Sequence, residues 1–153
     1  MRLFFALCLI LSVGAARAET ARPNVDWLGY EKTSEGYLID RDAGDPARHE
    51  ITPAWSDADP EDWDHVVLLM AKKSVAAYTV SVGSILATFR ERRRPARFSV
   101  WFFNKIPEIG REALDWAEAE DADLIMSIGS DTTIFLHGAY MGGEIPVVTS
   151  ASK

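Results

Sequence analysis

Short apolar runs recur along the second half of the chain, from about residue 65 onward, and amphipathic stretches separate them. Each run is apolar at consecutive positions, which is typical of strands buried on both faces, as in parallel sheets. The pattern predicts strands at residues 66–71, 97–103, 123–128 and 145–149.

The stretches between these runs predict helices. In the first, Val75, Tyr78, Val82, Ile85 and Phe89 recur at spacings of three and four, which places them on one helical face, and Pro95 ends the helix. The second helix is expected to begin near Asn104 or the next residue, with Pro107 in its first turn. The third is expected to take Ser130 or Asp131 as its N-cap and to end at Gly142-Gly143.

The order β-α-β-α-β-α-β predicts an α/β protein with a doubly wound parallel sheet, right-handed crossovers and helices on both faces. No helix follows the fourth predicted strand, and three helices divide unevenly over two faces. We therefore expect the chain to be a truncated piece of a longer protein, with residues 64–153 forming an incomplete ligand-binding lobe.

The segment 19–63 differs in composition from the rest of the chain, because it is rich in proline and acidic residues. Residues 36–39 are the exception and predict a short edge strand, or one arm of a hairpin after residues 27–30. The acidic run 56–64 lacks the ligand register, central glycine and closing glutamate of a calcium loop, so it is interpreted as a solvated linker.

The first eighteen residues have the form of a signal peptide. Arg2 precedes an apolar run over residues 3–15, and Ala16-Arg17-Ala18 supplies small residues at the expected cleavage site. The apolar run is shorter than the ~20 residues of a membrane span, and bulky Leu7 before Cys8 disfavours a lipoprotein. We expect export to the periplasm with cleavage after Ala18, which removes the only cysteine and leaves no disulfides.

Composition narrows the classes of partner. The 153 residues are 48% hydrophobic and 25% charged, as in ordinary globular domains, and the net charge of −7 argues against nucleic acid as a partner. The basic cluster Arg90 and Arg92–Arg94 is explained by the dipole at a helix C-terminus.

Candidate binding residues follow the predicted strands. If the strand order is 2-1-3-4, the loops after the first and third strands face one crevice at the carboxyl edge of the sheet. Helix N-termini and hydroxyls there suit a carboxylate or phosphate, whereas Asp131 favours an amine, so the two ends of an amino acid could each find a partner. Capping of the helices explains Ser74, Ser130 and Asp131 equally well. The predicted ligand-binding residues are Lys73, Ser74, Gly129, Ser130, Asp131, Thr132, Thr149 and Ser150.

Catalytic motifs are absent from the sequence. His49, His65 and His137 have no metal-ligand spacing, residues 128–132 contain no G-x-S-x-G elbow, and no lysine follows Gly138–Gly143 as a phosphate loop requires. We expect no catalytic residue, no metal, no cofactor and no enzymatic activity.

The string DLIMSIGSDTTIFLHGAYMGGEIPVVTSASK at residues 123–153 resembles the ABC transporter substrate-binding protein family, which has a type I periplasmic-binding fold. Residues 66–93, with the small-residue pattern at 76–84, resemble the family's opening βα unit. The resemblance implies two lobes that close over a small polar or amino-acid-like solute, delivered to an ABC permease in the inner membrane. Two alternatives remain: a flavodoxin-like interaction or regulatory module, and an exported α/β enzyme.

Overall fold

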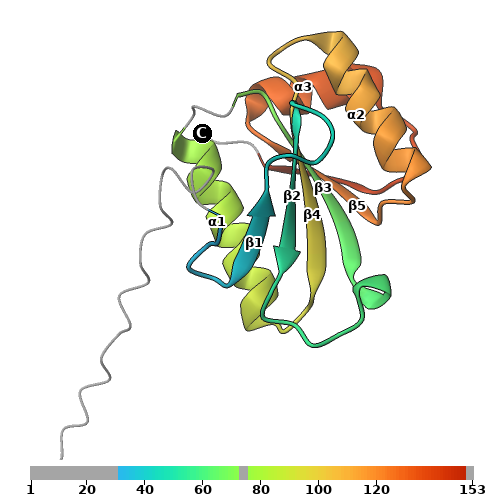
Figure 1. The fold of residues 1–153 in the computed structure, drawn as a ribbon. Coiled ribbons are helices and arrows are strands. Elements are labelled where there is room, and N and C mark those ends of the chain that lie inside the picture. The colour runs from blue at the N-terminus through green and yellow to red at the C-terminus, as the bar shows by residue number, and fades with distance from the viewer. Residues whose placement is uncertain (1–30, 73–75, 151–153) are drawn as a thin grey trace, which may run out of the picture.

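In the computed structural model, which describes residues 31–72 and 76–150, six strands form one sheet in the order β1-β2-β4-β3-β5-β6 (Figure 1). The strands are β1 (Tyr37–Asp40), β2 (Arg48–Pro53), β3 (Asp64–Met70), β4 (Ala96–Phe102), β5 (Leu124–Ile128) and β6 (Val147–Ser150). The helices are α1 (Ala76–Glu91), α2 (Pro107–Ala119) and α3 (Ser130–Ala139), and a 3₁₀ turn spans Pro60–Asp62.

The α/β class is confirmed. The four strands expected from the apolar runs are β3, β4, β5 and β6, and they pair in parallel in the order β4-β3-β5-β6. This is the 2-1-3-4 order on which the predicted crevice depends. The direction of winding reverses between β3 and β5, so the loops at the carboxyl ends of these two strands diverge there.

The expectation of an all-parallel sheet is wrong, because the sheet is mixed. β2 pairs antiparallel with β4, and β1 pairs antiparallel with β2. The strand expected near residues 36–39 is present as β1, but its hairpin partner is β2; residues 27–30 lie outside the described residues. Sequence reasoning missed β2 because His49, Ile51 and Pro53 are its buried positions, and a histidine and a proline hide the apolar alternation.

The two faces of the sheet are covered by different helices. On the face we call the α1 face, side chains such as Leu68, Phe98 and Val100 form one core with Val82 and Leu86 of α1. The opposite face, which we call the α2/α3 face, forms a second core with α2 and α3. The main residues that the strands and loops contribute to this core are Val67, Leu69, Trp101, Phe103 and Ile125.

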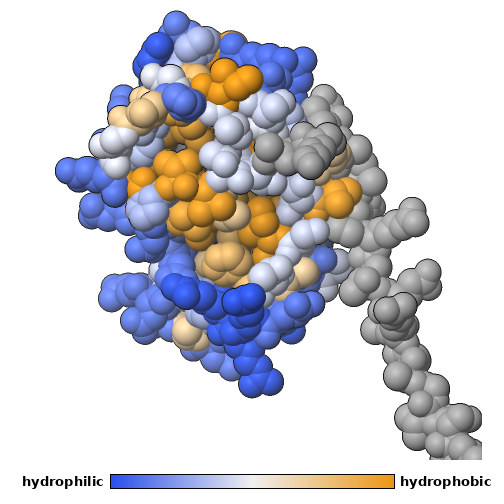
Figure 2. Space-filling model, turned by 180° about the vertical axis from the view of Figure 1, so that it is seen from behind, coloured by the Kyte–Doolittle hydropathy of each residue, from blue (hydrophilic) through white to orange (hydrophobic). Residues whose placement is uncertain are grey.

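Among residues 31–72 and 76–150, no helix lies over the last two strands of the α1 face. Met126 of β5 is only partly buried, and Val148, which pairs with it in β6, is 47% exposed. Figure 2 shows side chains of high hydropathy gathered on one side of the molecule and surrounded by hydrophilic residues. One helix is therefore too few to cover this face of the described sheet.

The helix starts differ from the predictions. Gly129 is the N-cap of α3 and Ile106 is the N-cap of α2, and neither start has a capping hydrogen bond from a side chain. The prediction that Ser130 or Asp131 caps the third helix is therefore wrong, because both lie inside its first turn. α3 also ends earlier than expected, at Ala139, with Tyr140 as its C-cap.

Candidate functional site

Two loops within the described residues lie at the carboxyl edge of the parallel strands, one after β4 and one after β5. The loop between β4 and α2 turns through Asn104 and Lys105, whose φ angles are 51° and 60°. Residues other than glycine seldom adopt this left-handed conformation, and two in succession hold a turn that carries strain. The turn is closed by a hydrogen bond of 2.8 Å from the Ile106 N–H to the Phe103 carbonyl, and it leaves Lys105 exposed.

The turn between β5 and α3 depends on a glycine. Gly129 has a φ of 93°, and a Cβ atom placed on it would lie 2.4 Å from the hydroxyl oxygen of Tyr78. The N–H of Gly129 donates to the Ser150 carbonyl at 3.0 Å, which ties this turn to the end of β6. Only a residue without a side chain allows this approach, so the turn and the Tyr78 ring fit together.

Tyr78 occupies the point where the winding of the sheet reverses. It extends from α1, and its ring packs against both cores of the protein, the one under α1 and the one under α2 and α3. A side chain that touches both cores lies at the edge of the sheet, where the α1 and α3 sides diverge. Tyr78 therefore lies beside the Gly129 turn, between the cores on the two faces of the sheet.

An ion pair connects the two loops. The Lys105 Nζ lies 2.7 Å from the Asp131 Oδ2, and both side chains are about half exposed, at 54% and 44%. The hydrogen bond to Asp131 raises the pKa of Lys105, and the Tyr78 phenol contributes in the same direction. One accessible cation and one accessible carboxylate thus stand together beside an aromatic ring.

The predicted ligand-binding residues fall into four groups, the last of which lies on β6. Gly129, Ser130 and Asp131 form the turn beside Lys105, and Ser130 is exposed. Thr132 is fully buried, and its hydroxyl donates to the Ile128 carbonyl, so it holds the turn from inside. Lys73 and Ser74 lie outside the described residues.

The last two predicted residues lie on the edge strand β6. Thr149 is exposed and lines a hollow of about 440 Å³ between β6 and α3, together with His137 and Tyr140. Ser150 is also exposed, and its carbonyl accepts the hydrogen bond from Gly129. Thr149 therefore borders a hollow whose lining does not include Tyr78.

Sequence reasoning missed the parts that Lys105 and Tyr78 contribute to this edge. The periodicity of the first helix predicts Tyr78 only as part of a buried stripe, and its contacts with the two cores partly bear this out. Lys105 follows a strand directly, and that position at a carboxyl edge was the available signal.

A second polar cluster lies under α2, at the amino ends of the strands. The Nη2 atom of Arg97 lies 3.0 Å from Nδ1 and 3.4 Å from Nε2 of His65, and Nε2 lies 2.8 Å from the Ser99 hydroxyl oxygen. Ser99 in turn donates to the carboxylate of Glu50, at 2.8 and 2.9 Å to its two oxygens. Hydrogen bonds in this cluster therefore connect β3, β4 and β2.

This cluster is not arranged for nucleophilic catalysis. In a catalytic triad the histidine stands between the nucleophile and the acid, whereas here Ser99 stands between His65 and Glu50. Ser99 is also fully buried. Burial lowers the pKa of His65 to about 4, with a further contribution from the charge of Arg97, and burial raises the pKa of Glu50.

Within residues 31–72 and 76–150, no group of three or more His, Cys, Asp or Glu side chains is placed to hold a metal ion. In the same described part of the chain, no helix combines the length and the apolar character needed to cross a membrane.

Comparison of the chain with models of protein families, with curated proteins and with solved structures finds no match. The arguments for function consequently rest on the residues and geometry of this chain.

Proposed function

We propose that this chain is the solute-binding component of an ABC importer, exported to the periplasm, and that its α/β region is half of a doubly wound lobe of the periplasmic-binding type. The solute is small and polar or amino-acid-like, and the partner that receives it is the permease in the inner membrane. The sequence resemblance at residues 123–153 supports the family, and the predicted leader supports export.

The observation that carries the proposal is the Lys105–Asp131 pair beside Tyr78 at the reversal of winding. Open α/β sheets bind ligands at this position, outside the carboxyl ends of the strands. An α-amino acid carries one carboxylate and one ammonium group. Its carboxylate can pair with Lys105 and its ammonium with Asp131, so the ligand replaces an internal ion pair with two intermolecular ones.

The Lys105–Asp131 ion pair is exposed, and this lowers the free-energy cost of replacing it with contacts to a ligand. An ion pair between exposed side chains contributes little to the stability of a fold. Opening the Lys105–Asp131 pair therefore costs the protein little, and the turn conformation of Asn104 and Lys105 holds the cation in place for the ligand.

The first experiment measures binding of the purified protein to a panel of amino acids by isothermal titration calorimetry. For an amino acid that binds, we also measure its carboxamide, which lacks the anion, and its deaminated acid, which lacks the cation. Both analogues are expected to bind at least about tenfold more weakly, because each loses one charged partner. If no amino acid binds, or if both analogues bind as well as the parent, the proposal is wrong.

Two variants assign the two ends of the ligand. Lys105→Ala is expected to lose the preference for the acid over the carboxamide, and Asp131→Asn the preference for the amine over the deaminated acid. Arg94→Ala is the matched control, because Arg94 forms an exposed ion pair with Asp64 at the opposite end of the strands. The control should bind every ligand as the unchanged protein does.

A further inference from the structure

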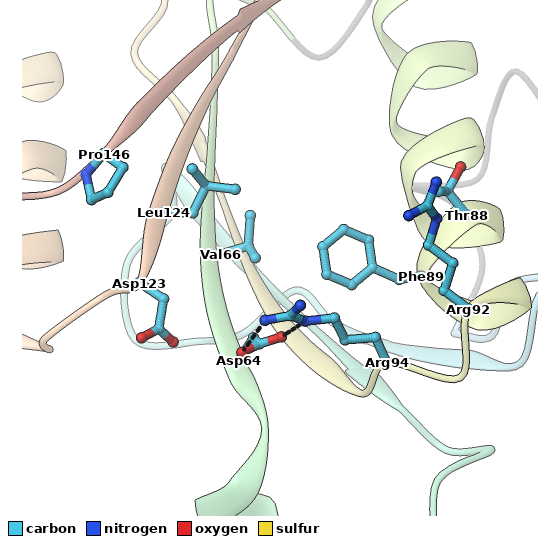
Figure 3. Close-up of a pocket in the computed structure, with 9 residues that line it drawn as sticks. All are labelled: Asp64, Val66, Thr88, Phe89, Arg92, Arg94, Asp123, Leu124 and Pro146. Atoms are coloured by element: carbon cyan, nitrogen blue, oxygen red, sulfur yellow. Dashed lines mark hydrogen bonds and ion pairs between the residues drawn. The ribbon is translucent and has the colours of Figure 1, made fainter.

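A hollow of about 500 Å³ opens on the α1 face, at the amino ends of β3 and β5. Figure 3 shows its apolar part, with Phe89 of α1 pointing toward Val66 and Leu124 and with Pro146 on the far side. Phe98 holds the ring of Phe89 in position, because the two rings pack edge to face at a centroid distance of 5.1 Å. The hollow is therefore part of a firmly packed structure.

Val148 extends this apolar area along the sheet edge. It follows Pro146 in β6, pairs with Met126 on the α1 face and is 47% exposed. All four residues of β6 are exposed. We call the area formed by Phe89, Leu124, Pro146 and Val148, with the buried Val66 beneath it, the open apolar surface. Contiguous exposed apolar areas of this kind, rimmed by polar residues, mark interaction sites.

Charges of opposite sign border the open apolar surface on opposite sides. Arg94 is neutralised by Asp64, with which it forms two hydrogen bonds. Arg92 is exposed on the α1 side, and within the described residues no ion pair of Arg92 is found. Asp123 is exposed on the β5 side, and one of its oxygens accepts the N–H of His65 at 2.8 Å. Figure 3 shows the apolar side chains between Arg92 and Asp123.

We propose that the open apolar surface is the interface with a second copy of this chain, related by a two-fold axis. Rotation by 180° about an axis through the apolar middle exchanges the two borders. Arg92 of each copy then faces Asp123 of the other, and Phe89 of each copy faces Leu124 of the other. A two-fold interface requires this self-complementarity, because the same surface is used by both copies.

The charge pattern favours a second copy over other occupants. A simple anion would meet Asp123, and a purely apolar molecule would leave both Arg92 and Asp123 without partners across the interface. A partner surface with an apolar centre, a carboxylate opposite Arg92 and a cation opposite Asp123 would pair with both charges. A second copy of this chain carries such a surface. The interface lies away from Lys105 and Asp131, so the proposal is independent of solute binding.

The first measurement is sedimentation equilibrium of the purified protein over about a hundredfold range of micromolar concentration. A concentration-dependent dimer is expected. A monomer at every concentration in this range would overturn the proposal.

Charge exchange tests the predicted pairing. Arg92→Glu sets two carboxylates against each other at both contacts of the dimer, and Asp123→Arg sets two guanidinium groups against each other there. Each variant alone is expected to weaken the dimer by at least about tenfold. In an equimolar mixture of the two variants, the heterodimer contains no like-charge contact if residue 92 of each copy faces residue 123 of the other. One of its two contacts then carries a reversed but attractive pair and the other the original pair, so the mixture should dimerise about as well as the unchanged protein.

The control for this experiment is Arg111→Glu. Arg111 is an exposed arginine on α2, so its substitution should leave dimerisation unchanged.

A second pair of variants guards against loss of folding in Asp123→Arg, which removes the acceptor for the His65 N–H. Val148 and Val147 are adjacent and exposed, at 47% and 37%, but they face opposite sides of the sheet. Val148→Asp is expected to abolish the dimer, whereas Val147→Asp leaves it intact. A dimer that survives both Val148→Asp and Arg92→Glu would show that another surface is used, and the proposal would be wrong.

Discussion

The two faces of the sheet differ in how completely they are covered and in what they bury. The α2/α3 face is covered by two helices and holds both an apolar core and the polar row of Glu50, Ser99 and His65. The α1 face is covered by one helix, and its core residues are almost entirely apolar, yet it remains open over β5 and β6. The polar row is thus buried where the cover is complete, and each of its members has a hydrogen-bond partner.

The difference shows that apolar character alone does not decide exposure. Leu124 and Met126 are apolar but only partly buried, because no described helix lies over them. Ser99, by contrast, is fully buried. Trp116 of α2 packs against its neighbour His65, and Glu120, the C-cap of α2, pairs with Arg97. Each prediction below tests one side of this contrast.

The largest effect is expected from the covered part of the α1 face. Phe98 is fully buried between Tyr37 and Phe89, so Phe98→Ala should lower the free energy of unfolding by about 3–5 kcal/mol. Met126→Ala, on the open part of the same face, should cost much less. Urea denaturation measures both, and equal losses would mean that the open area is covered in solution.

The next effect is a pH dependence that belongs to the α2/α3 face. The pKa of His65 is about 4 in the folded protein and near 6.5 when unfolded, so the unfolded chain binds the extra proton between these values. Stability is therefore highest above pH 6.5 and falls as the pH is lowered toward 4, by about 3 kcal/mol for this group.

His65→Gln isolates that contribution. The variant removes the titrating ring, so the difference in stability between the unchanged protein and His65→Gln should shrink as the pH falls from 7 to 4. Glu50 acts in the opposite sense, because its raised pKa favours folding at low pH. Comparison with Glu50→Gln separates the two groups, and a difference that is constant with pH would contradict the assignment.

A smaller effect is expected from the middle of the polar row. Ser99→Ala removes the hydroxyl that serves both His65 and Glu50, which leaves two buried groups without this partner. The cost should be about 1–3 kcal/mol by urea denaturation. Ser84→Ala is the control, because Ser84 is exposed on α1 and bonds only a carbonyl of its own helix, and its change should stay within about 0.5 kcal/mol.

The parallel part of the fold could be predicted because its signals are local. The run Val66–Ala71 is apolar at every position, which is typical of a strand buried on both faces, and the structure has β3 there. β2 could not be found this way, since half of its residues are charged or proline and its place in the sheet depends on pairing with β4, about fifty residues along the chain.

The candidate site was predictable in part for the same reason. Gly129 and Asp131 follow a strand in sequence, and that position alone marks the carboxyl edge. The partnership of Asp131 with Lys105 joins two separate loops, and the approach of Tyr78 to Gly129 joins a helix to a turn. Such pairings are set by how the helices pack, which no local pattern records.

The antiparallel edge of the sheet has a consequence for the order of folding. β1 and β2 are close in sequence and can pair early, whereas the contact of β2 with β4 closes a loop of about fifty residues and requires the β3-α1-β4 unit to exist first. The hairpin is thus expected to dock late, onto a preformed edge. Until it does, β4 presents an unpaired edge, and the newly made chain passes through a stage in which that strand can capture another molecule.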